Sequence, residues 1–197
     1  MSRTKRIVCP GHFHHITQRG NNRQAIFLID DDYALYLEWL RLRAAAAGVR
    51  IHAWCLMTNH VHVLATPMWE DSLADLFGPL HARFAQYIHR REGRVGHLFQ
   101  ARFYSCAADG DRAFDAVRYI ELNPVRAGMV AHAVDYPHSS TRARIQNLTD
   151  PLLDRSWPEP GSISNWQEWL EEPHALPPTK IDEIRRSTRL GRRLTKE

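Results

Sequence analysis

The sequence predicts an α+β fold of the ferredoxin-like (split βαβ) type: an antiparallel sheet with helices on one face, plus a C-terminal extension. Strand-like and helix-like segments follow one another in the order strand, helix, strand, strand, helix, strand, with a further helix after them. The length of 197 residues, 44% of them hydrophobic, suits one domain with an appendage. One face of the sheet is then expected to be open to ligands.

The first half of the chain contains the clearest helix and a hairpin. Residues 12–19 alternate weakly as a strand before a turn at residues 20–22. Residues 30–47 are predicted to be a helix, because aspartates at its start can cap it and Gly48 can end it. Its apolar stripe consists of Tyr33, Leu37, Leu40 and Ala44. Residues 49–57 and 60–66 are predicted to be the two strands of a hairpin.

The second half adds two helices and an aromatic strand. Residues 72–90 have apolar side chains at spacings of three and four, and Pro79 is expected to kink this helix or delay its start. Residues 98–107 are predicted to be a strand. A third helix over residues 111–122 is expected to end or bend at Asn123, because a proline follows.

The rest of the chain has an acidic segment followed by a basic one. Residues 150–172 contain six acidic residues and a single basic one, whereas residues 180–197 contain seven basic and three acidic residues. We therefore expect an acidic connector rich in Trp and Pro, residues 142–179, that packs on the core. Residues 180–197 are expected to form a basic C-terminal arm, flexible over Arg189 to Lys196 and lying against a polyanionic partner. A basic tail can equally be a solvated segment.

Other features limit the location and the chemistry. No apolar run approaches the roughly 20 residues that span a membrane, and no signal-like segment follows the N-terminus. We expect a cytoplasmic protein with no membrane partner. Cys9, Cys55 and Cys106 form no close pair, which argues against a disulfide framework or a structural zinc site.

His60 and His62 are the first candidates for chemistry. Residues i and i+2 of a strand point to the same face, so the two imidazoles lie side by side while Val61 and Val63 face the core. Such a pair can chelate one divalent ion. The alternative is that these are two polar residues on a solvated sheet face.

Tyr119 and Asn123 are one turn apart on a helix and share a face. Tyr119 lies at the edge of the apolar stripe, which permits a nucleophile as well as an ordinary core aromatic. A neutral phenol is a weak nucleophile, so it would need a metal-polarised phosphate or a nearby base.

Several motifs follow one another in one order over residues 8–141. They are HITQRGNNRQ (15–24), CLMTNHVHVL (55–64), GHLFQARF (96–103), RYIELNPVRAG (118–128) and the Ser139-Ser140 pair. In this series the sequence resembles the REP-associated tyrosine transposases, which belong to the HUH single-strand endonucleases.

The resemblance implies that residues 1–141 form a transposase and nuclease domain acting on hairpin-forming repeat DNA. His60 and His62 would hold Mg²⁺ or Mn²⁺, and Tyr119 would attack single-stranded DNA to leave a 5′-phosphotyrosine and a free 3′-hydroxyl. Related enzymes have a glutamine as the third metal ligand, and this chain has Asn123 at that position. The shorter side chain leaves open whether it binds the metal directly or through water.

Further candidates lie near these motifs or in the basic tail. The arginines considered for DNA contacts are Arg19, Arg102, Arg118, Arg126, Arg192 and Arg193. Each of those beside a motif could instead be an ordinary surface ion-pair residue. His12, His14 and His15 are not expected to join the metal site, because they lie on another strand and His15 points away from His14.

Two other functions remain open. One is a domesticated, non-cleaving DNA- or RNA-binding regulator, and the other is a metal-dependent hydrolase that activates water instead of Tyr119. The sequence also leaves open whether the protein is a monomer or a homodimer, and so whether the histidines and the tyrosine of one site come from one chain.

Overall fold

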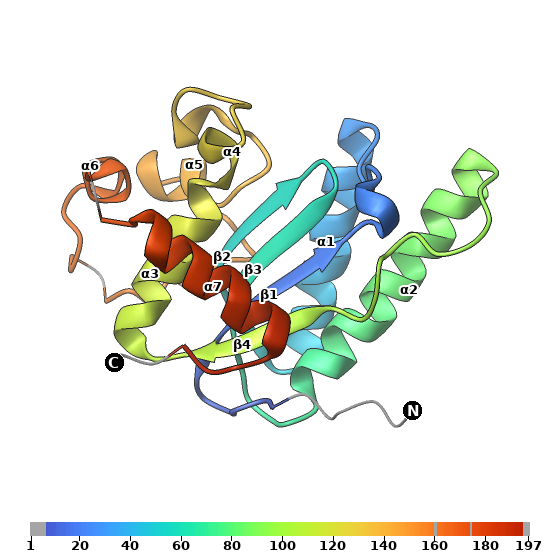
Figure 1. Ribbon diagram of the computed structural model, residues 1–197, viewed down its shortest axis with the longest axis horizontal. Helices are drawn as coiled ribbons and strands as arrows, with labels where there is room; N and C mark the ends of the chain where they lie inside the picture. The colour runs from blue at the N-terminus through green and yellow to red at the C-terminus, as the bar shows by residue number, and fades with distance from the viewer. Residues whose placement is uncertain (1–6, 160, 174, 195–197) are drawn as a thin grey trace.

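Four antiparallel strands form the centre of the computed structural model, which describes residues 7–159, 161–173 and 175–194. They are β1 (Phe13–Arg19), β2 (Val49–Met57), β3 (His60–Pro67) and β4 (Tyr104–Ala108), in the spatial order β2-β3-β1-β4 (Figure 1). This is the strand order of the split βαβ arrangement. The predicted α+β class with an antiparallel sheet is confirmed.

Helices cover both faces of this sheet, so the expectation of one free face is wrong. The helices are α1 (Asp30–Ala46), α2 (Ser72–Glu92), α3 (Gly110–Glu121), α4 (Asn123–Arg126), α5 (Thr141–Ile145), α6 (Trp166–Glu171) and α7 (Pro178–Leu190), with short 3-10 turns at Asn21–Arg23 and Ala133–Asp135. Helices α1 and α2 pack on one face, and α3 and α7 on the other (Figure 1). The reason is visible in β2 and β3, which are buried along almost their whole length, as is typical of strands covered on both sides.

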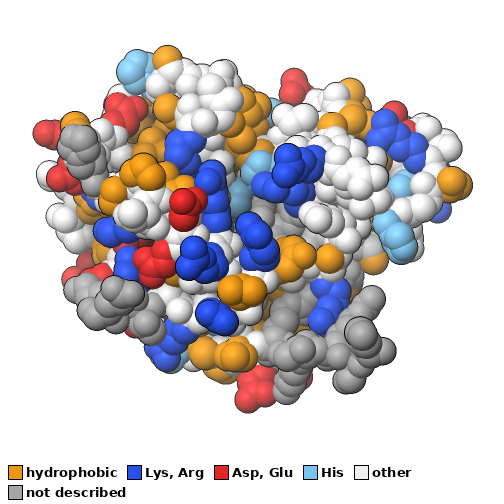
Figure 2. Space-filling view, in the orientation of Figure 1, with side chains coloured by type: hydrophobic (Ala, Val, Ile, Leu, Met, Phe, Trp, Pro, Cys, Tyr) orange, Lys and Arg blue, Asp and Glu red, His pale blue; other side chains and the backbone are white. Residues whose placement is uncertain are grey.

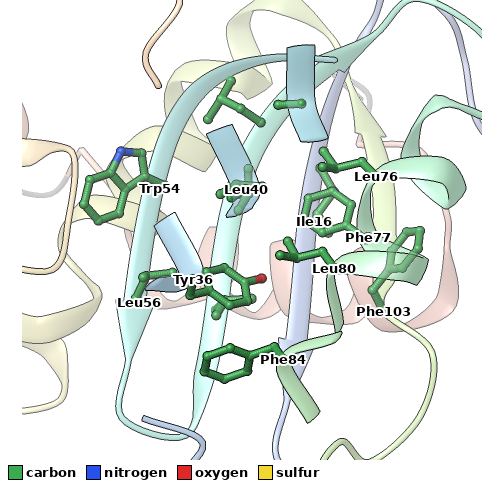
Figure 3. Close-up of a cluster of buried hydrophobic side chains, with 14 of the residues drawn as sticks. Ile16, Tyr36, Leu40, Trp54, Leu56, Leu76, Phe77, Leu80, Phe84 and Phe103 are labelled. Carbon is green, nitrogen blue, oxygen red and sulfur yellow. The ribbon is translucent and has the colours of Figure 1, made fainter. Parts of the chain in front are cut away.

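The first core lies between the sheet and the pair α1 and α2 (Figure 3). Ile16 and Leu56 from the strands meet Leu40 of α1 and Leu80 and Phe84 of α2, and all five side chains are fully buried. Each such side chain contributes about 1.5–3 kcal/mol by leaving water. The apolar spacing that predicted both helices is therefore the spacing that buries them.

Helix α2 begins at Ser72, as predicted, and Pro79 does not delay its start. The helix runs from Ser72 through the exposed Pro79 for 21 residues, because Leu73 and Phe77 of its first turns are buried in the first core. Even this longest helix is too polar to span a bilayer, and the same holds for every other helix in the described part of the chain.

The N-terminus of α1 is tied to the C-terminus of α2 through Asp32. Its buried carboxylate accepts hydrogen bonds from the backbone N–H groups of Leu28 (2.7 Å) and Ile29 (3.2 Å), and from Arg91 Nη2 (2.9 Å). A carboxylate in the first turn also complements the helix dipole. The two helices therefore hold a common orientation against the sheet.

Strand β4 is shorter than the predicted strand over residues 98–107. Gln18 Nε2 donates to the carbonyl oxygen of Ala101 (2.8 Å), and Gln24 Nε2 donates to that of Leu98 (3.0 Å). These side-chain amides satisfy carbonyl groups that a strand ladder would otherwise pair. Leu98 and Phe103 still bury their side chains in the first core, which explains their strand-like pattern.

The second core lies between the sheet and α3, and it includes the C-terminal part of the chain. The connector contributes Trp166, with Trp169 packed against it, while α7 contributes Ile184 and the residues after it contribute Leu194. Leu194 N–H also bonds to the carbonyl oxygen of Ala107 at 2.8 Å.

The prediction of a flexible arm is therefore wrong for Arg189 to Leu194, because an apolar stripe holds α7 against β4. Lys196 lies outside the described residues. The boundaries proposed at residues 141 and 179 remain predictions, since one core combines all three segments.

A buried carboxylate links α3 to the connector. Glu121 has no exposed surface, and it accepts hydrogen bonds from Ser140 Oγ (2.6 Å) and Trp166 Nε1 (2.8 Å). Burial raises the pKa of this carboxyl group above its ordinary range. Its hydrogen bonds hold the C-terminal end of α3 in place.

The burial of neutral histidines makes stability depend on pH. Burial lowers the pKa of His52 from 6.5 to about 4, and its Nε2 lies 2.8 Å from Thr66 Oγ1. As pH falls, the unfolded chain binds a proton at His52 before the folded chain does, so this group destabilises the fold progressively from about pH 6.5 to about pH 4. We expect His52→Gln to reduce the loss of unfolding free energy between pH 7.5 and pH 4.5 by about 2–3 kcal/mol.

Urea unfolding at a series of pH values measures this loss. His97→Gln, at an exposed histidine, is the matched control and should follow the wild-type curve. Parallel curves for His52→Gln and wild type would contradict the assignment.

Candidate active site

Strands β1 and β3 bring three histidines together on the face covered by α3 and α7. In the antiparallel register Arg19 lies opposite His60, and Thr17 lies opposite His62. His60 and His62 share a face, with ring centroids 4.9 Å apart. His15 joins them from β1, with its Nε2 at 2.9 Å from His62 Nδ1.

The histidine pair lies under helices rather than on a solvated sheet face. His62 is 3% exposed and His60 is half-buried. Burial, assisted by the nearby charge of Arg19, lowers the pKa of His60 to about 4, and burial holds the pKa of His62 well below 6.5. Both imidazoles are therefore neutral at neutral pH, which is the state that binds metals.

Tyr119 reaches this cluster from α3 of the same chain. Its ring centroid lies 5.4 Å from that of His62 and 5.5 Å from that of His15, in edge-on arrangements. The side chain is 5% exposed, which is deeper than its position at the edge of the helical stripe suggested. Helix α3 packs across β1, β2 and β3, and this packing puts the phenol against the imidazoles.

Two arginines flank the phenol. The Arg126 guanidinium lies 4.5 Å from the centre of the Tyr119 ring and donates to the Tyr119 carbonyl oxygen, while Arg185 Nε lies 3.4 Å from Tyr119 Oη. Burial lowers the pKa of Arg126 to about 10, so it stays charged at neutral pH. Its Nε and Nη1 atoms are buried without a hydrogen-bond partner among the described residues. Unpaired buried donors of this kind suit an anionic ligand.

The donor atoms around the histidines fit a divalent ion. Asn59 Nδ2 donates to the Arg23 carbonyl oxygen (2.9 Å), which turns Asn59 Oδ1 toward His60 Nδ1 (2.6 Å). An amide oxygen only accepts, so His60 carries its hydrogen on Nδ1 and leaves Nε2 free for a metal. His62 Nε2 is buried and lacks a partner within the described chain.

The described residues include no cluster of three His, Cys, Asp or Glu side chains suited to a metal. Ligands beyond the two imidazoles would therefore be amide, phosphate or water oxygens. Direct ligation by Asn123 remains a prediction.

Arg118 does not lie where a DNA clamp would need it. The residue is 8% exposed, its Nη2 donates to the Trp169 carbonyl oxygen and to Glu172 Oε2 (both 2.7 Å), and its guanidinium stacks on the Trp169 ring at 4.3 Å. The sequence position beside Tyr119 was misleading, because successive helical residues point to different sides. Arg118 fastens α3 to α6 instead.

The other proposed arginines are distributed unevenly. Arg19, Arg102 and Arg192 are exposed, whereas Arg193 is paired with Asp109 at 2.7 Å. Helix α7 adds three exposed arginines from the predicted basic C-terminal arm: Arg185, Arg186 and Arg189. Figure 2 shows Lys and Arg side chains gathered on the face that α7 crosses, with histidine visible between them.

Sequence reasoning missed His15, Thr188 and Arg185 as parts of this site. His15 was set aside because it lies on another strand, yet that strand is the direct neighbour of β3. The alternation of Phe13, His15 and Thr17 was a weak signal that His15 occupies one sheet face. No local pattern indicates that α7 returns to the sheet.

Comparison with known proteins identifies the family. The family model for IS200-like transposases matches residues 10–123, more than half of the chain, including His60, His62 and Tyr119. The chain belongs to the IS200-like transposase family. The transposase resemblance predicted from the motifs is thereby confirmed at the level of the family.

One solved structure supports the fold, and a second is reported beside it. The structure of a REP-associated tyrosine transposase bound to a REP hairpin matches with a TM-score of 0.58 and 22% identity, covering 78% of this chain and 92% of that one. A protein described as a transposase from Deinococcus radiodurans matches with a TM-score of 0.41 and 18% identity, covering 66% of this chain and 98% of that one. No curated protein matches the sequence significantly.

The structural role of Arg118 is testable. Arg118→Leu should lower the free energy of unfolding by about 1–3 kcal/mol, because Trp169 and Glu172 lose a charged donor. Denaturant unfolding measures this, and binding of single-stranded DNA per folded molecule should stay unchanged. Wild-type stability together with weakened DNA binding would restore the original assignment of Arg118 to DNA.

Proposed function

We propose that this transposase is a metal-dependent single-strand DNA endonuclease and strand-transferase that cuts through Tyr119. His60 and His62 hold a divalent ion, Mg²⁺ or Mn²⁺. The observation that carries the proposal is the arrangement within one chain: the phenol ring lies 5.4 Å from an imidazole whose Nε2 is buried and has no partner among the described residues. One chain supplies both parts of the site, so a monomer suffices.

In the proposed reaction Tyr119 Oη attacks a backbone phosphorus atom of single-stranded DNA. The bond from Tyr119 Oη to phosphorus forms, the bond from phosphorus to the 3′ oxygen breaks, and the phenolic proton ends on that 3′ oxygen. One phosphodiester replaces another, so a second 3′-hydroxyl can reverse the step and join strands. When bound, the divalent ion acts as a Lewis acid on the non-bridging phosphate oxygens.

Arg126 and Arg185 fit the charge that develops during this step. Arg185 Nε is directed at Tyr119 Oη and stabilises negative charge on the phenolic oxygen. The unpaired Nε and Nη1 of Arg126 are available to a phosphate oxygen next to the ring. Neither residue needs to exchange a proton.

The proposed substrate is hairpin-forming repeat DNA. The ordered motifs resemble those of REP-associated transposases, and a protein of similar fold is described as bound to a REP hairpin. The exposed arginines of α7, with Arg19 beside His60, provide the positive face such a substrate requires. Mobilisation of DNA and strand joining are the expected outcomes.

Trapping of a covalent adduct tests the nucleophile. Incubation with a hairpin oligonucleotide from the host genome and Mn²⁺ should yield a protein–DNA adduct in a denaturing gel, with a free 3′-hydroxyl on the released strand. Tyr119→Phe should abolish the adduct and retain DNA binding, because only the attacking oxygen is lost. Addition of EDTA should stop cleavage by wild type.

The other outcomes of this assay are distinct. Cleavage that persists in Tyr119→Phe would replace the tyrosine mechanism by a water-activating hydrolase. Binding without cleavage across the set of genomic hairpins would instead indicate a regulator.

Arg19 is expected to contact the DNA backbone beside His60. Arg19→Ala should weaken binding of single-stranded DNA and reduce the slope of log K against log salt by about 0.7. The matched control is Arg43→Ala, a partly exposed arginine on α1, across the sheet from the histidines. Fluorescence anisotropy at several salt concentrations measures both; equal slopes for the two variants would remove Arg19 from the interface.

A further inference from the structure

A chain of buried hydrogen bonds connects His62 to α7. His62 Nδ1 lies 2.9 Å from His15 Nε2, and His15 Nδ1 lies 2.8 Å from Thr188 Oγ1. Thr188 Oγ1 lies in turn 2.8 Å from the carbonyl oxygen of Ile184. His15, His62 and Thr188 are each at most 3% exposed, so water does not compete for these contacts.

The direction of every bond in this chain follows from its last member. A carbonyl oxygen only accepts, so the Thr188 hydroxyl must donate to Ile184. The same hydroxyl has no second hydrogen, so toward His15 it accepts, and His15 carries its hydrogen on Nδ1. A neutral imidazole has one N–H, which leaves His15 Nε2 as an acceptor. His62 must then donate from Nδ1.

The result is a defined tautomer at the proposed metal ligand. With its hydrogen on Nδ1, His62 presents a bare lone pair at Nε2, the atom that is buried without a partner in the described structure. The opposite tautomer would put an N–H on Nε2 and block ligation. Cys106 Sγ, 3.2 Å from Thr188 Oγ1, can donate into the remaining lone pair of the hydroxyl and leaves this order unchanged.

We propose that His15 and Thr188 are positioning residues that hold His62 in the tautomer able to bind the metal. The inference rests on the proposed metal site, but it concerns hydrogen bonds that exist without the ion. Second-shell partners of this kind orient a ligand and raise its basicity, and their loss costs about 10–100-fold in metal affinity. Thr188 lies beyond the residues 10–123 that match the family model, so the C-terminal helix takes part in the site.

The hydrogen-bond chain from Thr188 through His15 to His62 is called the relay below. Nitrogen NMR of the full-length, metal-free protein tests this relay directly. The ¹⁵N shifts of the imidazoles show which ring nitrogen carries the hydrogen. Wild type should have the His62 hydrogen on Nδ1, and Thr188→Ser, which keeps the hydroxyl, should retain it. Thr188→Val has nearly the same shape but no acceptor, so His15 loses its preference and His62 should become a mixture of tautomers.

Metal affinity provides the second readout. Mn²⁺ binding followed by electron paramagnetic resonance should weaken about tenfold in Thr188→Val relative to Thr188→Ser. Cys106→Ala is the packing control, because it alters a neighbour of Thr188 without removing the hydroxyl, and it should bind Mn²⁺ as wild type does. His15→Gln, whose amide oxygen can replace Nε2 as acceptor, should bind Mn²⁺ more tightly than His15→Leu.

The relay is overturned if wild-type His62 carries its hydrogen on Nε2, or if Thr188→Val matches Thr188→Ser in both tautomer and Mn²⁺ affinity. These measurements need no DNA, so they separate the relay from the proposed function. An adduct formed equally by Thr188→Val and wild type at limiting Mn²⁺ would reject the relay and leave the tyrosine mechanism standing. The predicted tautomers in a protein that forms no adduct would support the relay and reject the tyrosine mechanism.

Discussion

The pairing register of β1 against β3 is the constraint on which the site depends. It puts Arg19 opposite His60 and lets His15 reach His62. A shift of one residue would turn every side chain of β1 to the other face of the sheet. Such a shift would take Ile16 out of the first core and put His15 into it. Because helices bury both faces, apolar packing on one side specifies the register of polar groups on the other.

This arrangement allows polar side chains inside a covered sheet face. A buried imidazole is costly unless its nitrogen atoms find partners. His15 uses both of its nitrogens, on His62 and on Thr188. His62 Nε2 and two nitrogens of Arg126 remain unpaired in the described structure, and they surround the Tyr119 ring. These three unpaired nitrogens lie where a phosphate and a metal would supply the missing partners.

Local patterns predicted most elements, because the same spacing both forms a helix and buries it. Helices α1 and α2 and the hairpin of β2 and β3 lie within about two residues of their predicted bounds. Segment 98–103 forms an isolated bridge between Phe99 and Gly20 instead of a strand, and side-chain amides of Gln18 and Gln24, distant in sequence, bond its carbonyl groups on either side of that bridge. The packing of α3 and α7 on the second face was missed, although helix α3 itself was predicted and β3 lacks the polar alternation of a strand with one open side.

Within the site, the sequence could identify residue types but not neighbours. His60, His62 and Tyr119 were recognisable from spacing and from the motif series, and they do lie together. Arg118 was grouped with the DNA contacts because of its place next to Tyr119, whereas helical geometry directs it to Trp169. The contribution of α7 depends on contacts between residues more than 170 positions apart, such as His15 and Thr188. No local pattern carries such information.

The carboxylate of Glu121 joins the helix that carries Tyr119 to the C-terminal part of the chain. It ends the helix that carries Tyr119, and its partners Ser140 and Trp166 lie outside the region that defines the family. A fragment that ends at residue 141 would keep the Ser140 hydroxyl as a partner of Glu121. The same fragment would lack the Trp166 indole, the second hydrogen-bond donor to this carboxyl group. The tyrosine helix therefore cannot be exchanged as a cassette. A recombined protein would have to inherit a C-terminal region that brings its own indole to this acid.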